Sequence, residues 1–400
     1  MMQDNIRQQK LSLLSSVFTP AAPIIARDLF FGRIDQIKQV VETINERGQH
    51  GVLYGERGVG KTSLANILNV VLRNVLVAKV SCSRTDTFKD LWEKIFKRVS
   101  FVVKTTGVGF NAVDSETTYQ YNLFLPKEQE VAATDILAVF EHLQNPVLFI
   151  FDEYDSVHDS NTRLRFADTI KALSDNAPHV TVLLVGIAQS VTELVGAHPS
   201  NERCLRQIKL PRMSATELTD IVDNGLTKLE MTIDPFVKLH ILDFSQGFPH
   251  YTHLLSKYSA KIALESNSLN IDRQHFGIAI EEAIENVQES IRDSYHHAVM
   301  TSRTGTMFGD VLAACALAKE DEHGTFRATD LEVPLFKITG AHHPLQAYTY
   351  HLGKLSDSER GSILKKIELG KQHRYRFNNP LLRAYVRLKL YQSGKLEEKS

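Results

Sequence analysis

Residues Gly55-Glu-Arg-Gly-Val-Gly-Lys61-Thr62 decide the fold class of this 400-residue chain. They fit the pattern G-x-x-x-x-G-K-[ST], whose glycines let backbone N–H groups wrap around the phosphates of a nucleotide. The preceding stretch Val52–Tyr54 predicts a short buried strand, and a helix is predicted from Lys61 to Leu72. A phosphate loop requires this order of elements, and a chance glycine-rich turn would rarely have it. The expected nucleotide contacts in the loop are Gly55, Glu56, Arg57, Gly58, Val59, Gly60, Lys61, Thr62 and Ser63.

The end of this loop carries the charge and the metal ligand that a nucleoside triphosphate needs. Lys61 would neutralise the β- and γ-phosphate oxygens, and the Thr62 hydroxyl would bind Mg²⁺. The N-terminus of the following helix adds a partial positive charge beside the same phosphates. We therefore expect ATP or ADP and Mg²⁺ as ligands, and a cytoplasmic location where ATP is available.

A second motif, Val147-Leu-Phe-Ile-Phe-Asp152-Glu153, follows about ninety residues downstream. The apolar run predicts a buried strand with two acids at its carboxyl end. Asp152 would hold Mg²⁺, directly or through water, and Glu153 would polarise the attacking water as a general base. Such a pair is weak evidence alone, but together with the phosphate loop it predicts an ATPase. Asp155 is expected to cap the next segment or to face solvent.

Apolar β-branched runs alternate with helical segments through the first half of the chain. The further runs are 76–81, 147–151, 180–185 and 207–210. Continuous apolar strands separated by helices indicate an α/β fold with a parallel sheet that is covered on both faces. Residues 102–130 interrupt this pattern with turn residues and a mostly polar sequence, and are interpreted as an insertion or a long loop.

The strands stop after Pro211, and the rest of the chain is predicted to be mostly helical. Ser214 and Glu217 have the spacing of a capping box, which predicts the start of a helix. Three or four helices are expected up to about residue 302, and the residues that follow are interpreted as a joint.

The C-terminal part has a different order of elements. A helix over about 307–319, two short helices ending near Leu355, a hairpin over 362–377 and a last helix over 380–390 are predicted. Three helices followed by a hairpin is the order of a winged helix-turn-helix. The expected domains are a leader (1–23), a nucleotide-binding core (24–212), a helical lid with a connecting helix (213–302), a winged helix (303–390) and a tail (391–400).

Composition excludes several classes of protein. Lys plus Arg is 46 and Asp plus Glu is 47, so the net charge of −1 excludes a uniformly basic nucleic-acid coat. Cys82, Cys204 and Cys315 lie far apart, which favours a reducing compartment over a disulfide framework. No apolar run approaches the ~18 residues that a membrane span needs. The short N-terminal apolar stretch is broken by serines, and we interpret it as an amphipathic leader rather than a secretion signal.

Several stretches together resemble the AAA+ ATPases of the initiator-like clade, which includes origin-recognition proteins and overlaps the STAND regulatory ATPases. The resemblance covers about residues 24–265, and the C-terminal part resembles winged-helix domains only in its order of elements. The stretches are Phe30-Phe-Gly32-Arg33, the phosphate loop, Val80 to Trp92, Asp152-Glu153, Val182 to Ser190, and Gly247-Phe-Pro-His250. The resemblance implies an AAA+ parallel-sheet P-loop core with an all-α lid, and places Gly32 and Arg33 beside the adenine.

Two positions depart from the pattern of this family. Sensor 1 is commonly Asn, and Gln189 is aligned there with Ser190 next to it; Gln189 would orient water or contact the γ-phosphate, and a structural role is an equal alternative. Sensor 2 is commonly Arg, and His250 takes that place. A neutral imidazole hydrogen-bonds a phosphate without supplying a permanent charge, so nucleotide sensing by the lid is expected to be weaker or pH-sensitive.

The resemblance also implies an arginine finger just before the last core strand. Arg203 and Arg206 are the two candidates, and their spacing of three would place them on one helical face. Arg203 is favoured because it lies further from the strand, and a surface salt bridge is the alternative for either residue. A finger would act in trans, so self-association in the ATP state is expected.

The last structural segment is basic. Residues 341–390 contain ten Lys or Arg and three acids, a local net charge of +7. On a winged helix this charge predicts contact with the phosphates of duplex DNA, and Lys371, Arg374 and Arg376 would lie at or beside the wing tip. Winged helices also dock proteins, so a protein partner is the alternative.

Three functions remain open at this point. The first is a DNA-binding ATPase of initiator, loader or transposition-helper type. The second is a STAND-like signalling ATPase, for example in anti-phage defence, whose winged helix contacts protein. The third is a nucleotide-binding scaffold that barely turns over.

Overall fold

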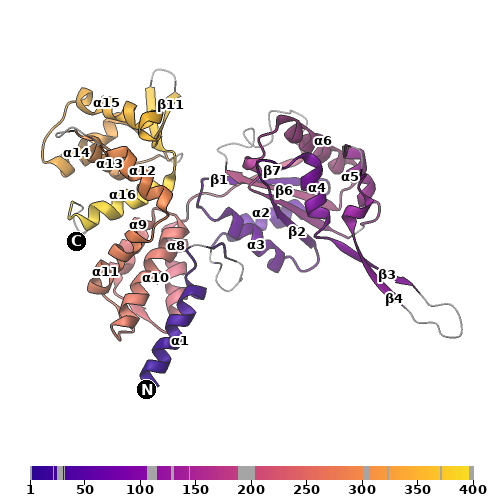
Figure 1. Cartoon of the computed structure of the whole chain (residues 1–400), viewed down its shortest axis with the longest axis horizontal. Helices are drawn as coiled ribbons and strands as arrows, with labels where there is room; N and C mark the ends of the chain where they lie inside the picture. The colour runs from indigo at the N-terminus through magenta and orange to yellow at the C-terminus, as the bar shows by residue number, and fades with distance from the viewer. Residues whose placement is uncertain are drawn as a thin grey trace. The chain divides into compact units, whose positions relative to one another are not determined.

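The protein is seen here as a computed structural model, and its residues form two compact units (Figure 1). Residues 23–212 form the sheet unit, and residues 1–22 with 213–400 form the helical unit. The structure describes residues 2–20, 22–24, 30, 32–105, 115–127, 130–143, 145–187, 203–300, 306–321, 324–369 and 372–395. None of the helices formed by these residues has the length and hydropathy to cross a membrane.

A five-stranded parallel sheet forms the centre of the sheet unit, in the order β2–β5–β6–β1–β7. The strands are β1 (His50–Gly55), β2 (Leu76–Ser81), β5 (Val147–Asp152), β6 (Val180–Ile187) and β7 (Leu205–Lys209). The expected α/β class with a parallel sheet is therefore confirmed. Because all five strands run the same way, their carboxyl ends meet at one edge, and both predicted motifs lie at that edge.

Helices cover both faces of this sheet. They are α2 (Ile34–Asn45), α3 (Lys61–Val71), α4 (Phe88–Phe96), α5 (Ala133–Phe140) and α6 (Ser160–Asn176). On one face the core gathers around Trp92, which packs against Phe149, Phe151 and Phe166. Successive strand residues point to opposite faces, so Ile150 points to the other face, where α3 packs against the strands. Burial on both faces explains why the strands are continuously apolar.

The segment 102–130 is not simply a long loop. β3 (Ser100–Thr105) and β4 (Ser115–Gln120) pair as an antiparallel hairpin, which a short 3₁₀ helix (Tyr121–Phe124) follows. The opposed rings of Phe101 and Tyr119 stack with their centroids 5.8 Å apart, and such cross-strand aromatic pairs stabilise a hairpin. The long-loop interpretation is wrong for these residues, while 106–114 lie outside the described part.

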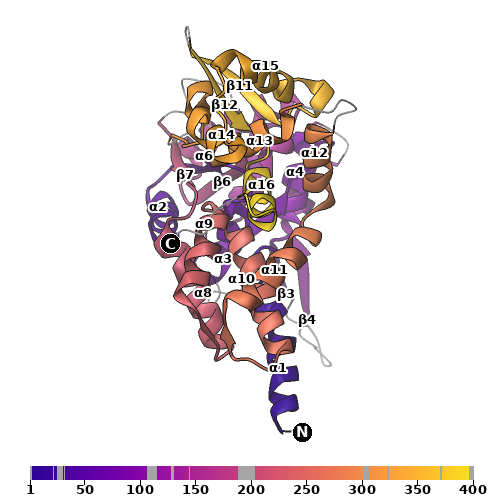
Figure 2. The same cartoon turned by 90° about the vertical axis from the view of Figure 1, so that its left-hand side faces the viewer.

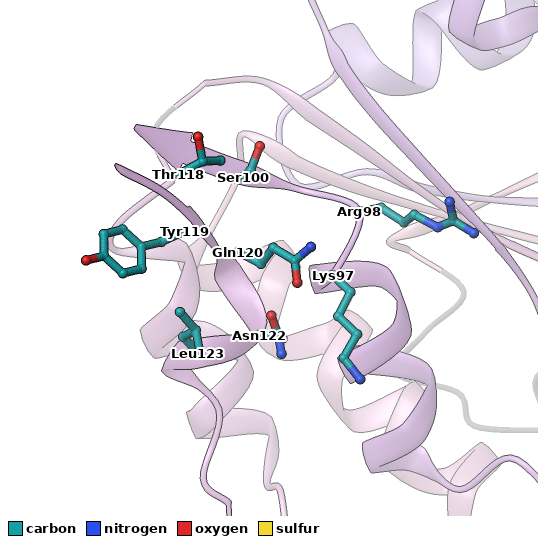
Figure 3. Close-up of a pocket in the computed structure, with 8 residues that line it drawn as sticks. All are labelled: Lys97, Arg98, Ser100, Thr118, Tyr119, Gln120, Asn122 and Leu123. Atoms are coloured by element: carbon teal, nitrogen blue, oxygen red, sulfur yellow. The ribbon is translucent and has the colours of Figure 1, made fainter. Parts of the chain in front are cut away.

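A pocket of about 390 Å³ lies at the root of this hairpin (Figure 3). Its lining is mostly polar and comes from the residues just after α4, from the hairpin and from the 3₁₀ helix that follows it. The residues are Lys97, Arg98, Ser100, Thr118, Tyr119, Gln120, Asn122 and Leu123. No residue of the phosphate loop contributes to it, so this pocket is separate from the predicted nucleotide site.

Five helices follow the sheet unit within the described residues, where three or four were expected. They are α8 (Ala215–Lys228), α9 (Pro235–Ser245), α10 (Pro249–Glu265), α11 (Arg273–Glu285) and α12 (Glu289–Val299). The predicted capping box is present: the Ser214 hydroxyl accepts from the Glu217 amide at 3.2 Å, and the Glu217 carboxylate accepts from the Ser214 amide at 2.9 Å. Two-residue strands β8 (Thr232–Ile233) and β9 (Asn270–Ile271) pair in parallel between these helices.

The N-terminal segment belongs to this helical unit. Helix α1 (Met2–Val17) packs on α10, and the Phe18 ring after it is completely buried. That ring lies so close to Gly225 of α8 that a Cβ there would be 2.5 Å from it. The buried Lys10 ammonium donates to the Leu229 carbonyl at the C-terminus of α8, 2.6 Å away, where the helix dipole favours a cation.

The C-terminal residues form a small helical layer with a three-stranded antiparallel sheet in the order β10–β12–β11. The elements are α13 (Phe308–Leu317), β10 (Phe326–Arg327), α14 (Glu332–Thr339), α15 (Leu345–Ser356), β11 (Leu364–Leu369), β12 (Gln372–Phe377) and α16 (Pro380–Gln392). Helix α16 packs against α9, α11, α12 and α13, so it joins this layer to the preceding helices (Figure 2). The Tyr251 hydroxyl donates to the Leu381 carbonyl at 2.8 Å within the same region.

Two buried imidazoles, one in each unit, are held neutral. Nδ1 of His50 accepts a hydrogen bond from the Val182 amide at 3.0 Å, and burial lowers the pKa of His50 to about 4. His253 lies edge-on to the Phe18 ring, with centroids 6.0 Å apart. Burial, assisted by the neighbouring His250, lowers the pKa of His253 to about 4.

We expect the free energy of unfolding to fall as the pH decreases from about 6.5 to about 4. An unfolded histidine takes up its proton near pH 6.5, whereas these two stay neutral in the fold down to about pH 4, so each costs up to ~3 kcal/mol across this window. Denaturant unfolding at a series of pH values measures the slope, which His50→Gln should reduce. His158→Gln, at an exposed side chain, should keep the wild-type slope. An unchanged slope in His50→Gln would contradict the assignment.

Candidate nucleotide-binding site

The phosphate loop has the backbone conformation that its glycines predict. Gly58 and Gly60 have φ angles of 86° and 97°, a region that residues with a Cβ rarely adopt. Gly60 is also the N-cap of α3, so the loop leads directly into the N-terminus of that helix. A Cβ on Gly55 would lie 2.3 Å from the Leu210 carbonyl, which therefore fixes the start of the loop.

The Lys61 ammonium is folded back into the loop. Its Nζ donates to the carbonyls of Gly55 and Glu56, at 3.0 and 2.8 Å. Burial lowers the pKa of Lys61 to about 8, and the carboxylates of Asp155, Asp152 and Glu56 partly oppose this shift. Both motifs lie at the carboxyl edge of the sheet, because β1 and β5 each pair in parallel with β6. A largely desolvated cation held by two loop carbonyls beside the N-terminus of α3 is suited to binding a phosphate.

Asp152 ends β5 and is almost completely buried, with 2% of its surface exposed. Its Oδ1 accepts from the Glu153 amide at 3.0 Å. Its Oδ2 forms an ion pair with the Lys79 ammonium, whose Nζ lies 2.9 Å away. A buried carboxylate at the carboxyl edge of the sheet, with the Thr62 hydroxyl at the start of α3 on the same edge, supplies the oxygen ligands that fit a hard cation such as Mg²⁺.

Glu153 stands out by its backbone and its exposure. Its φ is 57°, in the left-handed region, which costs a residue with a Cβ roughly 1–2 kcal/mol. Its side chain is exposed, whereas that of Asp152 is buried. The two adjacent acids therefore have different surroundings, as a metal ligand and a general base require.

The sequence predicted that Asp155 would cap the next segment or face solvent, but its side chain does neither. Its Oδ1 accepts from the amide of Ile187, the last residue of β6, at 2.8 Å. It therefore fixes the end of the strand that leads toward Gln189 and Ser190. Those two residues, with their predicted sensor role, lie outside the described residues.

Residues before β1 support the loop from outside the motif. Gly32 and Arg33 both have positive φ angles, 73° and 61°, where the chain turns into α2. The buried Arg33 guanidinium donates from Nη2 to the Val59 carbonyl of the loop at 3.1 Å. The Ser63 hydroxyl accepts from the Ile24 amide at 3.1 Å. The adenine contacts expected of Gly32 and Arg33 stay a prediction.

Two charged residues at this site were not predicted from the sequence. Arg212 pairs with Glu56 of the loop, with Nε 2.8 Å from Oε2. Lys79 pairs with Asp152 at the end of β5. The available signal for Lys79 was its place as the one charged residue in the run Leu76-Val-Ala-Lys-Val-Ser81, since a lysine inside a buried strand requires a partner.

The two arginine-finger candidates do not share a helical face, and that expectation is wrong. Arg206 lies in β7, opposite Gly51 of β1, and pairs with Glu42 of α2. Arg203 lies in the turn before β7, and its side chain is exposed. Because β7 pairs with β1, the strand extends further toward the N-terminus than the sequence indicated.

His250 is the second residue of α10 in the helical unit. Its Nδ1 donates to the Pro20 carbonyl at 2.7 Å. Burial lowers the pKa of His250, which keeps the imidazole neutral. The residue therefore holds the N-terminal segment on α10, and its proposed contact with nucleotide stays a prediction.

Much of the positive charge in 341–390 is neutralised inside the helical unit. Arg374 pairs with Asp321 at 2.8 Å, Arg383 with Glu320 at 2.6 Å, and Arg387 with Asp243. These acids lie outside the basic segment, so its local count of +7 overstates the exposed charge. The DNA contact expected of Arg374 stays a prediction for a side chain that is already paired with Asp321, and Lys371 lies outside the described residues.

Three basic side chains of the hairpin β11–β12 form no ion pair among the described residues. Lys365 and Lys366 are exposed, and Arg376 is half-buried. Lys365 and Arg376 lie directly opposite each other across the hairpin. Like charges in such positions repel, so this pair is the strongest candidate for an anion contact in the C-terminal layer.

Residues 44–195 match the model of the family described as "AAA domain". The structure of the Walker-type ATPase PABY2304 of Pyrococcus abyssi is similar with a TM-score of 0.56 and 14% identity, over 93% of this chain and 99% of that one. The Aeropyrum pernix ORC2 protein, in ADPNP-ADP complexes, has a TM-score of 0.51 and 13% identity, over 94% and 98%. No curated protein sequence matches the chain. These likenesses agree with an AAA+ P-loop α/β fold.

Proposed function

We propose that the AAA domain in residues 44–195 binds and hydrolyses ATP with Mg²⁺. The observation that carries this proposal is the arrangement at the carboxyl edge of the sheet. There the Lys61 ammonium donates to two carbonyls of a loop whose Gly58 and Gly60 have left-handed backbones, and the buried Asp152 carboxylate ends β5 at the same edge.

Each residue of the edge has a separate task in this proposal. The loop amides and Lys61 bind the β- and γ-phosphates. When nucleotide binds, Nζ of Lys61 donates to phosphate oxygens in place of the Gly55 and Glu56 carbonyls. Thr62 and Asp152 would hold Mg²⁺, which when bound neutralises phosphate charge. The exposed Glu153 accepts a proton from the attacking water.

Lys61→Ala and Glu153→Gln should separate binding from hydrolysis. Lys61→Ala should weaken ATP binding at least about 100-fold, because a charged contact to phosphate contributes about 3 kcal/mol. Glu153→Gln should keep ATP affinity and lower turnover by about 100-fold or more, because only water activation is removed. A fluorescent ATP analogue measures binding, and phosphate release measures turnover. Equal loss of binding in both variants would contradict these roles.

We further propose that Arg203 completes the site of a neighbouring subunit. It is exposed in the turn before β7, whereas Arg206 is held by Glu42. An arginine supplied in trans stabilises the charge that develops on the transferred phosphate. Self-association in the ATP state follows from this role.

Arg203→Ala should keep ATP affinity and lower turnover by ~10³-fold. A mixture with Lys61→Ala protein should regain activity, because one subunit supplies the finger and another the intact pocket. Arg206→Ala is the matched control and should retain most of its turnover. The trans role fails if mixing restores nothing and light scattering shows a monomer with ATP analogue bound.

We propose that the C-terminal layer is a winged helix that contacts the phosphates of duplex DNA. The order α13, β10, α14, α15 and the hairpin β11–β12 supports the winged helix. The unneutralised pair Lys365 and Arg376 supports the phosphate contact, because a bound anion would relieve their repulsion. The function that follows is a DNA-binding ATPase of initiator, loader or transposition-helper type.

The double variant Lys365→Glu and Arg376→Glu should weaken DNA binding for all sequences. The salt slope of binding should fall by about one for each phosphate that the variant no longer neutralises. Fluorescence anisotropy with the full chain at several salt concentrations measures this. Lys38→Glu with Lys319→Glu, two exposed lysines, changes the net charge equally and should bind like wild type.

One observation favours the alternative of a STAND-like signalling or anti-phage ATPase. Helix α15 exposes Tyr350 and Leu345, at 63% and 43%, while its single lysine, Lys354, pairs with Glu359. Exposed apolar side chains on a helix are suited to a protein partner. Wild-type protein without DNA affinity at low salt, both with and without ATP, would leave this alternative as the better account.

A further inference from the structure

Lys79 connects the phosphate-loop helix with the acid of the second motif. Its Nζ lies 2.9 Å from Oδ2 of Asp152 and donates to Oδ1 of Asn66 in α3 at 2.6 Å. The side chain is 22% exposed and that of Asp152 is 3% exposed. The ammonium is therefore a fixed part of the site and not a mobile surface charge.

The register of the strands explains how Lys79 reaches both partners. In β2, Ala78 and Val80 point into the core that contains α4, so Lys79 points to the opposite face, where α3 lies. Lys79 lies opposite Ile150 of β5, and Asp152 is the next residue of β5 on that same face. The long side chain of Lys79 reaches from its position opposite Ile150 to Asp152, two residues nearer the carboxyl edge.

Oδ2 of Asp152 is the partner of the Lys79 ammonium and is also the proposed ligand of Mg²⁺. A carboxylate this buried is unfavourable without a compensating cation, and Lys79 provides one inside the protein. The same oxygen is the one proposed to face Mg²⁺. Two cations at one carboxylate oxygen repel each other, so the protein's own cation must weaken the binding of the metal.

We propose that Lys79 is a positioning residue that competes with Mg²⁺ for Asp152 while it holds the carboxylate in place through Asn66. This inference rests on the proposed ATPase function and assigns a regulating role within the same site. Lys79 sets the Mg²⁺ concentration at which nucleotide binds, and it restores a neutral pair whenever the metal leaves.

Lys79→Met is the direct test, because it removes the charge and retains most of the apolar length. The Mg²⁺ concentration for half-maximal binding of a fluorescent ATP analogue should decrease about tenfold, since one repelling charge is removed. Turnover at saturating Mg²⁺ should decrease, because Asp152 loses its tether. Lys97→Met, at a lysine paired with Glu93 on the surface of α4, should leave both values unchanged.

Asn66→Leu separates the two parts of the proposal. It removes the tether and keeps the charge, so turnover should decrease while the Mg²⁺ requirement stays within about twofold of wild type. Lys79→Gln, which retains hydrogen bonding without the charge, should show the lower Mg²⁺ requirement even if Lys79→Met does not fold.

The outcomes distinguish this inference from the proposed function. If wild-type protein binds no ATP analogue at any Mg²⁺ concentration, the ATPase proposal fails. If wild type binds nucleotide and the Lys79 variants lose only thermal stability, with an unchanged Mg²⁺ requirement, the pair is purely structural and this inference is overturned.

Discussion

The parallel pairing of β2, β5, β6 and β1 is the constraint on which the site depends. It brings the carboxyl ends of the strands to one edge, so charges from distant parts of the sequence meet where little water reaches them. Lys61, Asp152 and Lys79 are each stabilised there by an opposite charge or by backbone dipoles. No member of this group would be stable at its position alone.

The phosphate loop depends equally on residues that do not belong to its motif. The Leu210 carbonyl limits the space at Gly55, the Arg33 guanidinium holds the Val59 carbonyl, and Arg212 pairs with Glu56. These contacts come from before β1 and after β7. The glycines of the motif allow the loop several backbone conformations, and these contacts from the rest of the sheet unit stabilise one of them.

The sequence predicts those parts of the structure that local rules determine. The strand 76–81 and the Ser214–Glu217 cap were predicted at their observed positions, because apolar runs and capping spacing are local properties. The ion pairs were not predicted, because they join residues that are far apart in the sequence. Arg387 and its partner Asp243 are 144 residues apart, so the charge count of 341–390 does not include Asp243. The contact of Lys79 with Asp152 can be expected only once the register of β2 and β5 is known.

The helical unit is discontinuous along the chain, and this has a consequence for how the protein is made. Helix α1 is synthesised before the sheet unit, but the carbonyl partner of Lys10, at Leu229, lies 219 residues further along the chain. The whole sheet unit is synthesised between α1 and Leu229. It can fold while the apolar face of α1 is still exposed to solvent. Phe18 is then buried against Gly225 only after α8 has emerged. Helix α1 is thus made before the sheet unit but can be packed only after it, which leaves its apolar face exposed while the sheet unit is synthesised.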